Sequence, residues 1–162
     1  MQKKIYFGLI LLFTVILVNA PSQEEYLRIS ANVEPRSIKQ GEEGTLKIKI
    51  TPSNALKISS HPEFMIKLDK NNNISFPKLF FTASELDLPT RQENEAVFLD
   101  LDKEVSVPFK VNEDSLLGQH KISGEIVFTA VFKKDNWCLK TYQKFTANFK
   151  SKRNYKLKNK KR

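Results

Sequence analysis

The residues with the most reactive chemistry lie in one short segment of the chain, residues 133–140. It contains Cys138, the single cysteine among 162 residues, directly after Trp137. Three basic residues accompany this thiol: Lys133, Lys134 and Lys140. Neighbouring cations favour the thiolate, which is the nucleophile in thiol–disulfide chemistry. Cys138 is therefore the candidate reactive thiol, and the alternative is a small apolar side chain packed beside Trp137.

Other catalytic and metal-binding patterns are absent from the sequence. It has no Gly-rich phosphate loop, no Gly-x-Ser-x-Gly elbow and no His-Glu-x-x-His pair. His61 precedes a proline in a predicted turn and His120 stands at the entrance of a predicted strand, so we expect both at the surface. Asp100 and Asp102 are expected to be solvated charges on the outward face of a strand. One cysteine and two histidines cannot supply the four ligands of a structural zinc site, and we expect no metal and no cofactor.

The net charge of +9 belongs to the two ends of the chain. Residues 1–20 carry two basic residues and residues 150–162 carry eight, with no acidic residue in either segment. The 17 basic and 18 acidic residues between them make the body electrostatically neutral. This distribution disfavours nucleic acid as a partner, because nucleic-acid binding uses basic residues arranged on a folded face. We predict a disordered basic tail over residues 150–162, with contact to an anionic lipid or cell-surface polymer as its alternative role.

The N-terminus has the pattern of a secretory signal peptide, which we assign to residues 1–22. Two lysines precede an apolar run over residues 5–18, and Ala20 and Ser22 are small residues suited to a cleavage site. The run is shorter than the ~20 residues that span a bilayer comfortably. We therefore expect an exported protein, periplasmic or extracellular, with an uncleaved N-terminal anchor as the alternative.

Period-two alternation of apolar and polar residues runs through residues 26–149 and is typical of half-buried strands. Seven such series are present: 26–33, 46–50, 64–68, 97–101, 105–111, 122–132 and 145–149. Residues 82–96 are predicted to be a long loop and residues 133–140 a hairpin tip. This pattern predicts an immunoglobulin-like antiparallel β-sandwich over residues 23–149. We expect Leu116 and Leu117 to plug one end of the sandwich and Gly118 to adopt a positive φ.

Two stretches of the sequence carry a family resemblance. Residues 33–42 combine a predicted strand with a Gly-Glu turn, and residues 118–130 form a long predicted strand that leads into residues 136–139. Both are similar to the N-terminal periplasmic domain of the thiol:disulfide interchange protein DsbD, the disulfide bond corrector family. The resemblance covers residues 26–149 and implies an immunoglobulin-like fold.

The resemblance also has an implication for the thiol. In that family the corresponding hairpin carries two cysteines, about five or six positions apart, that cycle between dithiol and disulfide. The second cysteine matches Cys138, whereas the first falls at Val131 or Phe132, neither of which can form a disulfide. Exchange turnover needs a resolving thiol, so the resemblance implies a module without independent redox turnover.

The sequence leaves three hypotheses of function. The first is an exported accessory or binding module of the cell envelope, whose partner is an envelope protein such as a thioredoxin-like protein and whose contact residues are Trp137, Val131 and Phe132. The second is a thiol–disulfide exchange protein in which Cys138 works with a resolving cysteine of the partner. The third is a secreted immunoglobulin-like adhesion or structural domain in which Cys138 only packs.

Overall fold

The computed structural model describes residues 27–61, 64–134 and 137–155 of the chain. The predicted signal peptide, residues 1–22, and residues 156–162 of the predicted tail lie outside the described residues. The strands in the described ranges are β1 (Leu27–Glu34), β2 (Ser37–Lys39), β3 (Glu43–Pro52), β4 (Leu56–Ile58), β5 (Met65–Leu68), β6 (Ile74–Ser75), β7 (Phe80–Thr82), β8 (Thr90–Glu93), β9 (Ala96–Leu99), β10 (Val105–Val111), β11 (Gly118–Phe132) and β12 (Cys138–Lys152). No helix within these ranges has the length and apolar character needed to cross a membrane.

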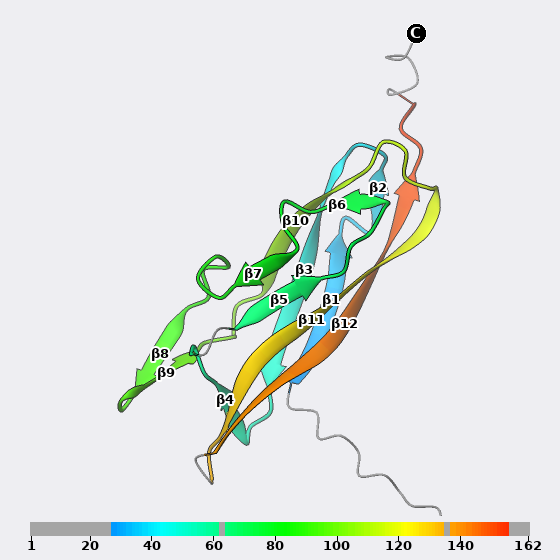
Figure 1. Cartoon of the computed structure of the whole chain (residues 1–162). Helices are drawn as coiled ribbons and strands as arrows, with labels where there is room; N and C mark the ends of the chain where they lie inside the picture. The colour runs from blue at the N-terminus through cyan, green and yellow to red at the C-terminus, as the bar shows by residue number, and fades with distance from the viewer. Residues whose placement is uncertain (1–26, 62–63, 135–136, 156–162) are drawn as a thin grey trace, which may run out of the picture.

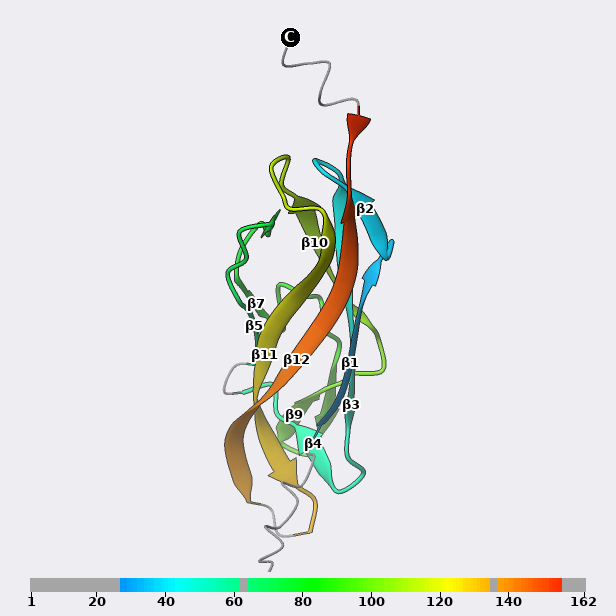
Figure 2. The same cartoon turned by 90° about the vertical axis from the view of Figure 1, so that its right-hand side faces the viewer.

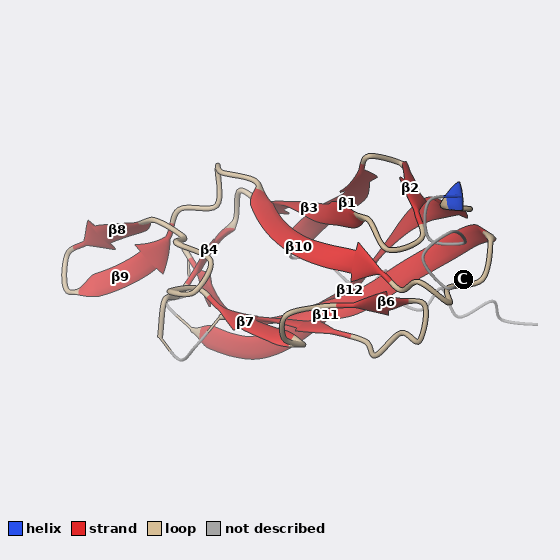
Figure 3. Cartoon of the chain, turned by 90° about the horizontal axis from the view of Figure 1, so that it is seen from above, coloured by secondary structure: helices blue, strands red, loops and turns tan. Residues whose placement is uncertain are grey.

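Apart from β8 and β9, the strands form two facing sheets (Figure 1). One sheet has the order β1-β3-β10-β6, and the other has the order β2-β12-β11-β5-β7, with β4 also paired to β11. Viewed from above, β1, β3 and β10 lie over β11, β12 and β7 (Figure 3). The predicted immunoglobulin-like β-sandwich is confirmed. The pairing is antiparallel except where β2 runs parallel to β12.

The alternating sequence pattern buries one side of each strand between the sheets. In β10, Val105, Val107, Phe109 and Val111 are buried, and the residues between them are exposed. The ring of Phe109 packs against Phe149 of β12 in the opposite sheet, with 5.5 Å between the ring centroids. Each such side chain contributes about 1.5–3 kcal/mol when it is buried. The interleaving of the two apolar faces is therefore what holds the sandwich together.

The two longest strands, β11 and β12, form a hairpin that runs the length of the molecule (Figure 2). They are paired from Gly118 opposite Ser151 to Val131 opposite Cys138. At ~3.4 Å per residue this ladder is about 40 Å long. The closed end of the hairpin lies at one end of the molecule, and the loop between β10 and β11 lies at the other end, beside the end of β12 (Figure 1).

Two loop predictions are wrong. Residues 82–96 are not one long loop, because β8 and the first residue of β9 lie within them and pair in a separate two-stranded sheet. This β8–β9 hairpin projects to one side of the sandwich (Figure 3). The hairpin tip is also shorter than residues 133–140, since β12 already begins at Cys138.

The predicted domain boundary at residue 149 is wrong as well. Strand β12 continues to Lys152, and Ser151 is buried. Parallel pairing with β2 extends the ladder here, with Ser151 opposite Ile38. The basic tail therefore begins inside the folded domain. The prediction for Gly118 is confirmed, with a φ of 119°.

Candidate functional site

The candidate site lies where the β11–β12 hairpin closes, and it consists of Val131, Phe132, Trp137 and Cys138. Val131 and Phe132 end strand β11, Cys138 begins β12, and Trp137 immediately precedes β12. We call these four residues the hairpin-end site. The structure brings together all four residues that the sequence singled out, because the antiparallel register closes the hairpin at this point.

Val131 is directly opposite Cys138 in the β11–β12 ladder. The backbone N–H of Phe132 donates to the carbonyl of Trp137 at 3.0 Å, so this neighbouring pair is the hydrogen-bonded type. The Val131–Cys138 pair is consequently the non-hydrogen-bonded type, in which opposite Cα atoms are only about 4.5 Å apart. Of the two positions implied by the family resemblance for a first cysteine, the register therefore favours Val131.

Trp137 and Phe132 lie on the other face of the hairpin. Their rings are stacked, with centroids 4.1 Å apart and an interplanar angle of 4°. Successive residues of a strand point to opposite faces, which separates this stack from the Val131–Cys138 pair. Cys138 is exposed, so the alternative in which it packs beside Trp137 is not what the structure shows. Trp137 keeps 43% of its surface exposed despite the stacking.

Two lysines at this end of the molecule, Lys57 and Lys133, have partners other than the thiol. Strand β4 places Lys57 beside Val131, where its ammonium group forms an ion pair with Glu93 and lies 4.9 Å from the centre of the Phe98 ring. The hydrogen bond from Lys57 is the main reason that the pKa of Glu93 lies below its ordinary value of 4.5. Lys133 donates to the carbonyl of Asn54 at 2.8 Å. No pattern in the sequence pointed to Lys57 and Glu93, because they reach this end of the molecule from β4 and β8.

A cleft of about 390 Å³ opens between β4 and the β8–β9 hairpin near this site. Its lining includes two ion pairs, Lys57–Glu93 and Arg91–Asp100, the second with 3.1 Å between nitrogen and oxygen. The paired charges neutralise one another across the cleft. Asp100 thus lies in an ion pair after β9, and the prediction of a solvated charge on a strand face is wrong for it.

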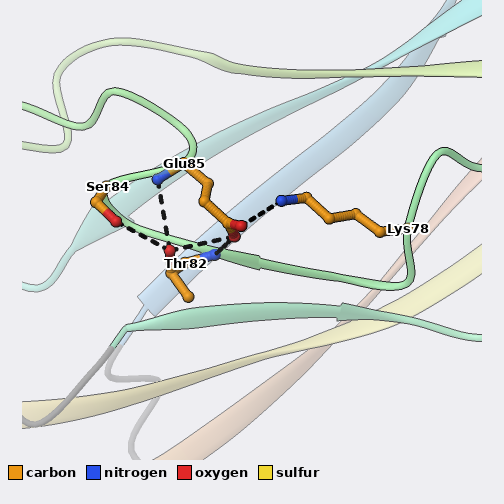
Figure 4. Close-up of polar contacts among 4 residues, drawn as sticks. All are labelled: Lys78, Thr82, Ser84 and Glu85. Atoms are coloured by element: carbon orange, nitrogen blue, oxygen red, sulfur yellow. Dashed lines mark hydrogen bonds and ion pairs between the residues drawn. The ribbon is translucent and has the colours of Figure 1, made fainter.

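A polar cluster of four residues, Lys78, Thr82, Ser84 and Glu85, lies around the end of β7 (Figure 4). The Glu85 carboxylate accepts from the backbone N–H of Thr82 at 2.9 Å and also pairs with Lys78, while Thr82 Oγ1 accepts from the Glu85 N–H at 3.4 Å. This reciprocal pattern is a capping box for one helical turn, and its Thr-x-x-Glu signature is legible in the sequence. The hydrogen bond from Lys78 is the first cause, and that from Thr82 the second, of the lowered pKa of Glu85. The cluster is structural, since each polar group in it is directed at another member.

The histidines have structural partners. His120 donates from Nε2 to the carbonyl of Leu116 at 2.6 Å, and its ring stacks on Phe149 with 5.2 Å between centroids. His61 is exposed and lies 2.9 Å from the Ser60 hydroxyl through Nδ1. Among the described residues, no cluster of three or more His, Cys, Asp or Glu side chains could hold a metal ion.

Fold and site together define an immunoglobulin-like β-sandwich module with an exposed thiol at the end of its longest hairpin. No protein-family model matches the sequence, and no curated protein matches it. Structures with a similar arrangement of strands include a cohesin module from a Clostridium perfringens family 33 glycoside hydrolase, with a TM-score of 0.38 and 9% identity over 79% of this chain and 96% of that one. A FixG-related protein from Vibrio parahaemolyticus has a TM-score of 0.34 and 13% identity over 78% of this chain and 97% of that one. A likeness at this level assigns neither an activity nor a partner.

Proposed function

We propose that the protein is an exported accessory or binding module that contacts a protein partner through the hairpin-end site. The observation that carries this proposal is the Trp137–Phe132 stack, which holds a 43%-exposed indole ring in one orientation at the end of the molecule. Tryptophan is enriched among the residues that dominate binding energies. A ring that is already fixed loses little conformational entropy when a partner covers it.

The other face of the site supports contact without electron transfer. Val131 stands opposite Cys138 at the position where an internal disulfide would need a second sulfur. The apolar Val131 side chain offers a surface for packing and no resolving thiol. The resemblance to the N-terminal domain of DsbD also supports protein contact at this hairpin, with a partner from the thiol-redox class.

Photo-crosslinking in the exporting cell tests this proposal. A benzophenone amino acid replaces Trp137 in one variant and Phe80 in the control, since Phe80 is a 61%-exposed aromatic residue on β7. We expect a discrete envelope protein to be trapped from position 137 only. With that partner purified, Trp137→Ala should weaken binding about 30-fold or more, as is usual for a hot-spot residue. Identical adducts from both positions, or unchanged affinity for Trp137→Ala, would overturn the proposal.

A second candidate function is thiol–disulfide exchange, and the exposure of Cys138 favours it. The Cys138 thiolate would attack one sulfur of a partner disulfide, forming a mixed disulfide and releasing the partner's other sulfur as a thiolate. Because this chain has no second cysteine, the thiolate that resolves the mixed disulfide comes from outside the chain, and the thiolate released on the partner is in place to do so. Cys138 then returns to the thiol state in which it started, so the reaction would tether the partner reversibly.

Labelling of the native protein with a coloured aromatic disulfide tests this candidate. We expect stoichiometric labelling of Cys138 without denaturant, and no labelling of Cys138→Ser. Reaction only after unfolding would remove thiol exchange from consideration and leave the Trp137 surface as the sole basis for partner binding.

A further inference from the structure

The end of the sandwich opposite the hairpin tip exposes apolar side chains that the sequence predicts to be buried. Leu116 and Leu117 follow a short turn between β10 and β11, and they are 71% and 49% exposed. The prediction that they plug the sandwich end is therefore wrong. Tyr155, beyond the end of β12, is 74% exposed. A shallow hollow at this end is lined by both Leu117 and Tyr155.

The exposure of these leucines is built into a fixed loop. The Leu116 N–H donates to Asn73 Oδ1 at 3.0 Å, and the Leu116 carbonyl accepts from His120. The carbonyl of the preceding Ser115 accepts from Gln40 Nε2 at 2.7 Å, and Ser115 is buried. The loop is thus anchored on both sides of the leucines. The anchored backbone therefore holds both leucine side chains outward, in contact with water. An apolar binding partner would cover them, which is favourable because it removes apolar surface from water.

Positive charge surrounds the same hollow. Its lining includes four cations: Lys39, Lys150, Lys152 and Arg153. Lys39 lies 3.6 Å from Glu42, and the loop also carries the exposed acids Glu113 and Asp114. Five further basic residues follow Tyr155 in the sequence: Lys156, Lys158, Lys160, Lys161 and Arg162. The described lining of the hollow thus holds four cations and no acidic residue.

We propose that this end of the sandwich docks on an anionic lipid bilayer, with Leu116 and Leu117 inserted between headgroups and the cations around them on lipid phosphates. The combination of exposed apolar side chains and basic residues fits a lipid interface, where both parts find a partner. A soluble polyanion would neutralise the cations and leave the leucines in water. Each basic residue near an anionic bilayer strengthens binding about fivefold, the equivalent of ~1 kcal/mol.

Docking at this end would orient the molecule. The β11–β12 ladder extends away from Gly118 and Ser151 towards Val131 and Cys138. The hairpin-end site would then stand about 40 Å from the lipid, free to meet a partner. The two surfaces are separate, so membrane docking does not depend on the function proposed for the hairpin.

Sedimentation with vesicles tests the docking surface in the full chain. Vesicles of phosphatidylcholine with about 30% phosphatidylglycerol should bind the protein at near-physiological salt, and pure phosphatidylcholine should not. The paired change Leu116→Ser and Leu117→Ser should weaken binding about tenfold or more, and so should the triple change Lys150→Gln, Lys152→Gln and Arg153→Gln. The matched controls are Phe80→Ser, and Lys140→Gln with Lys144→Gln at exposed positions of the same strand, which should bind like the wild type.

Fluorescence measures insertion independently of affinity. In Leu117→Cys with Cys138→Ser, an environment-sensitive dye at position 117 should brighten and shift to the blue when vesicles are added. The same dye on the native Cys138, at the far end of the hairpin, should not respond. A purely electrostatic contact would give a different outcome: the charge variant would lose binding, the leucine variant would bind fully, and the dye at position 117 would not respond. That outcome would overturn the proposal. Absence of binding to the anionic vesicles would overturn it outright.

Discussion

At the residue scale, the pair that matters for thiol chemistry is Val131 and Cys138, which lie opposite one another in the β11–β12 ladder. The hydrogen bond between Phe132 and Trp137 defines which pairs of the ladder are close, and it makes this pair one of them. Cross-strand disulfides need Cα atoms about 4.4–6.8 Å apart, a range that includes the ~4.5 Å of a non-hydrogen-bonded pair. The chain therefore has the geometry for a disulfide and lacks one of the two sulfurs.

Val131→Cys should close a disulfide with Cys138 under mild oxidation, whereas Phe132→Cys should not. The side chain of residue 132 lies on the opposite face, stacked on Trp137. Thiol counting and the mass loss on oxidation distinguish the two variants. Closure from position 132 in preference to 131 would contradict the register. Failure of both would remove the main support for kinship with the DsbD domain.

Glu85 provides a pH-dependent prediction at the same scale. Its pKa is lowered from 4.5 by the hydrogen bonds from Lys78 and Thr82, so its folded-state interactions favour the charged carboxylate. Their contribution to stability is complete above the unfolded pKa and is lost as the pH falls through the lower folded value. Glu85→Gln should reduce the melting temperature at about pH 7, and the difference from wild type should shrink near pH 3.

The control for this experiment is Glu95→Gln, at an exposed carboxylate in the turn between β8 and β9. Its melting temperature should follow that of the wild type at both pH values. An equal deficit for Glu85→Gln at both pH values would mean that its charge is not the stabilising feature of the capping box.

At the element scale, the central pairing of β11 with β5 and β12 depends on Gly124. A Cβ atom at this position would lie 2.5 Å from the backbone carbonyl oxygen of Lys67 and 2.8 Å from Cζ of Phe145. The Phe145 ring can move, but the Lys67 carbonyl belongs to strand β5 in the same sheet. Gly124 is therefore what permits the close approach of β5 in the middle of this sheet.

Gly124→Ala should lower the free energy of unfolding by about 1–3 kcal/mol, as expected for overpacking in a core. Ser123→Ala, at the neighbouring residue on the opposite face of β11, should change it by no more than about 0.5 kcal/mol. Chemical denaturation of both variants measures the difference. Equal stabilities would show that β5 shifts at little cost and that the glycine is not required.

At the scale of the whole molecule, the end of β12 ties the basic segment to the sandwich. The N–H of Gln40 donates to the Lys152 carbonyl at 2.9 Å, and Asn154 Nδ2 donates to the Gln40 carbonyl at 3.0 Å. Ser151 extends the ladder between Gly118 of β11 and Ile38 of β2. These contacts join the end of β12 to β2 and to the turn that follows β2.

Two truncations separate the folded part of this segment from the rest. A chain ending at Lys150 should lose about 1–3 kcal/mol of stability, because it lacks these backbone and side-chain hydrogen bonds. A chain ending at Tyr155 keeps all of them and should be within about 0.5 kcal/mol of the full chain. Thermal or denaturant unfolding measures the stability of both truncated chains. Equal stability of the two would place the true end of the domain before Ser151.

Local patterns in the sequence determined much of this molecule. The alternation in residues 105–111 and 122–132 predicted which side chains enter the core, because a strand has a period of two whatever it pairs with. The succession of such strands predicted an immunoglobulin-like sandwich. The position of Gly118 just before a predicted strand predicted its positive φ. Trp137 and Cys138 of the hairpin-end site were also identifiable, since the only thiol and the only indole stand side by side in the chain, whereas Val131 and Phe132 were named through the family resemblance.

Only the tertiary structure decided which segments meet. Alternation does not reveal a strand's partner, so the pairing of β8 with β9 and the continuation of β12 to Lys152 beside β2 were missed. The choice of Val131 over Phe132 required the register of two strands, in which a shift of one residue exchanges the faces. Leu116 and Leu117 were expected inside because they are apolar, yet their loop is fixed with both side chains outward. The Leu116 N–H donates to Asn73, and His120 and Gln40 donate to carbonyls of the loop. Asn73 and Gln40 come from segments distant in the sequence, and long-range contacts leave no periodic signal in the residues that make them.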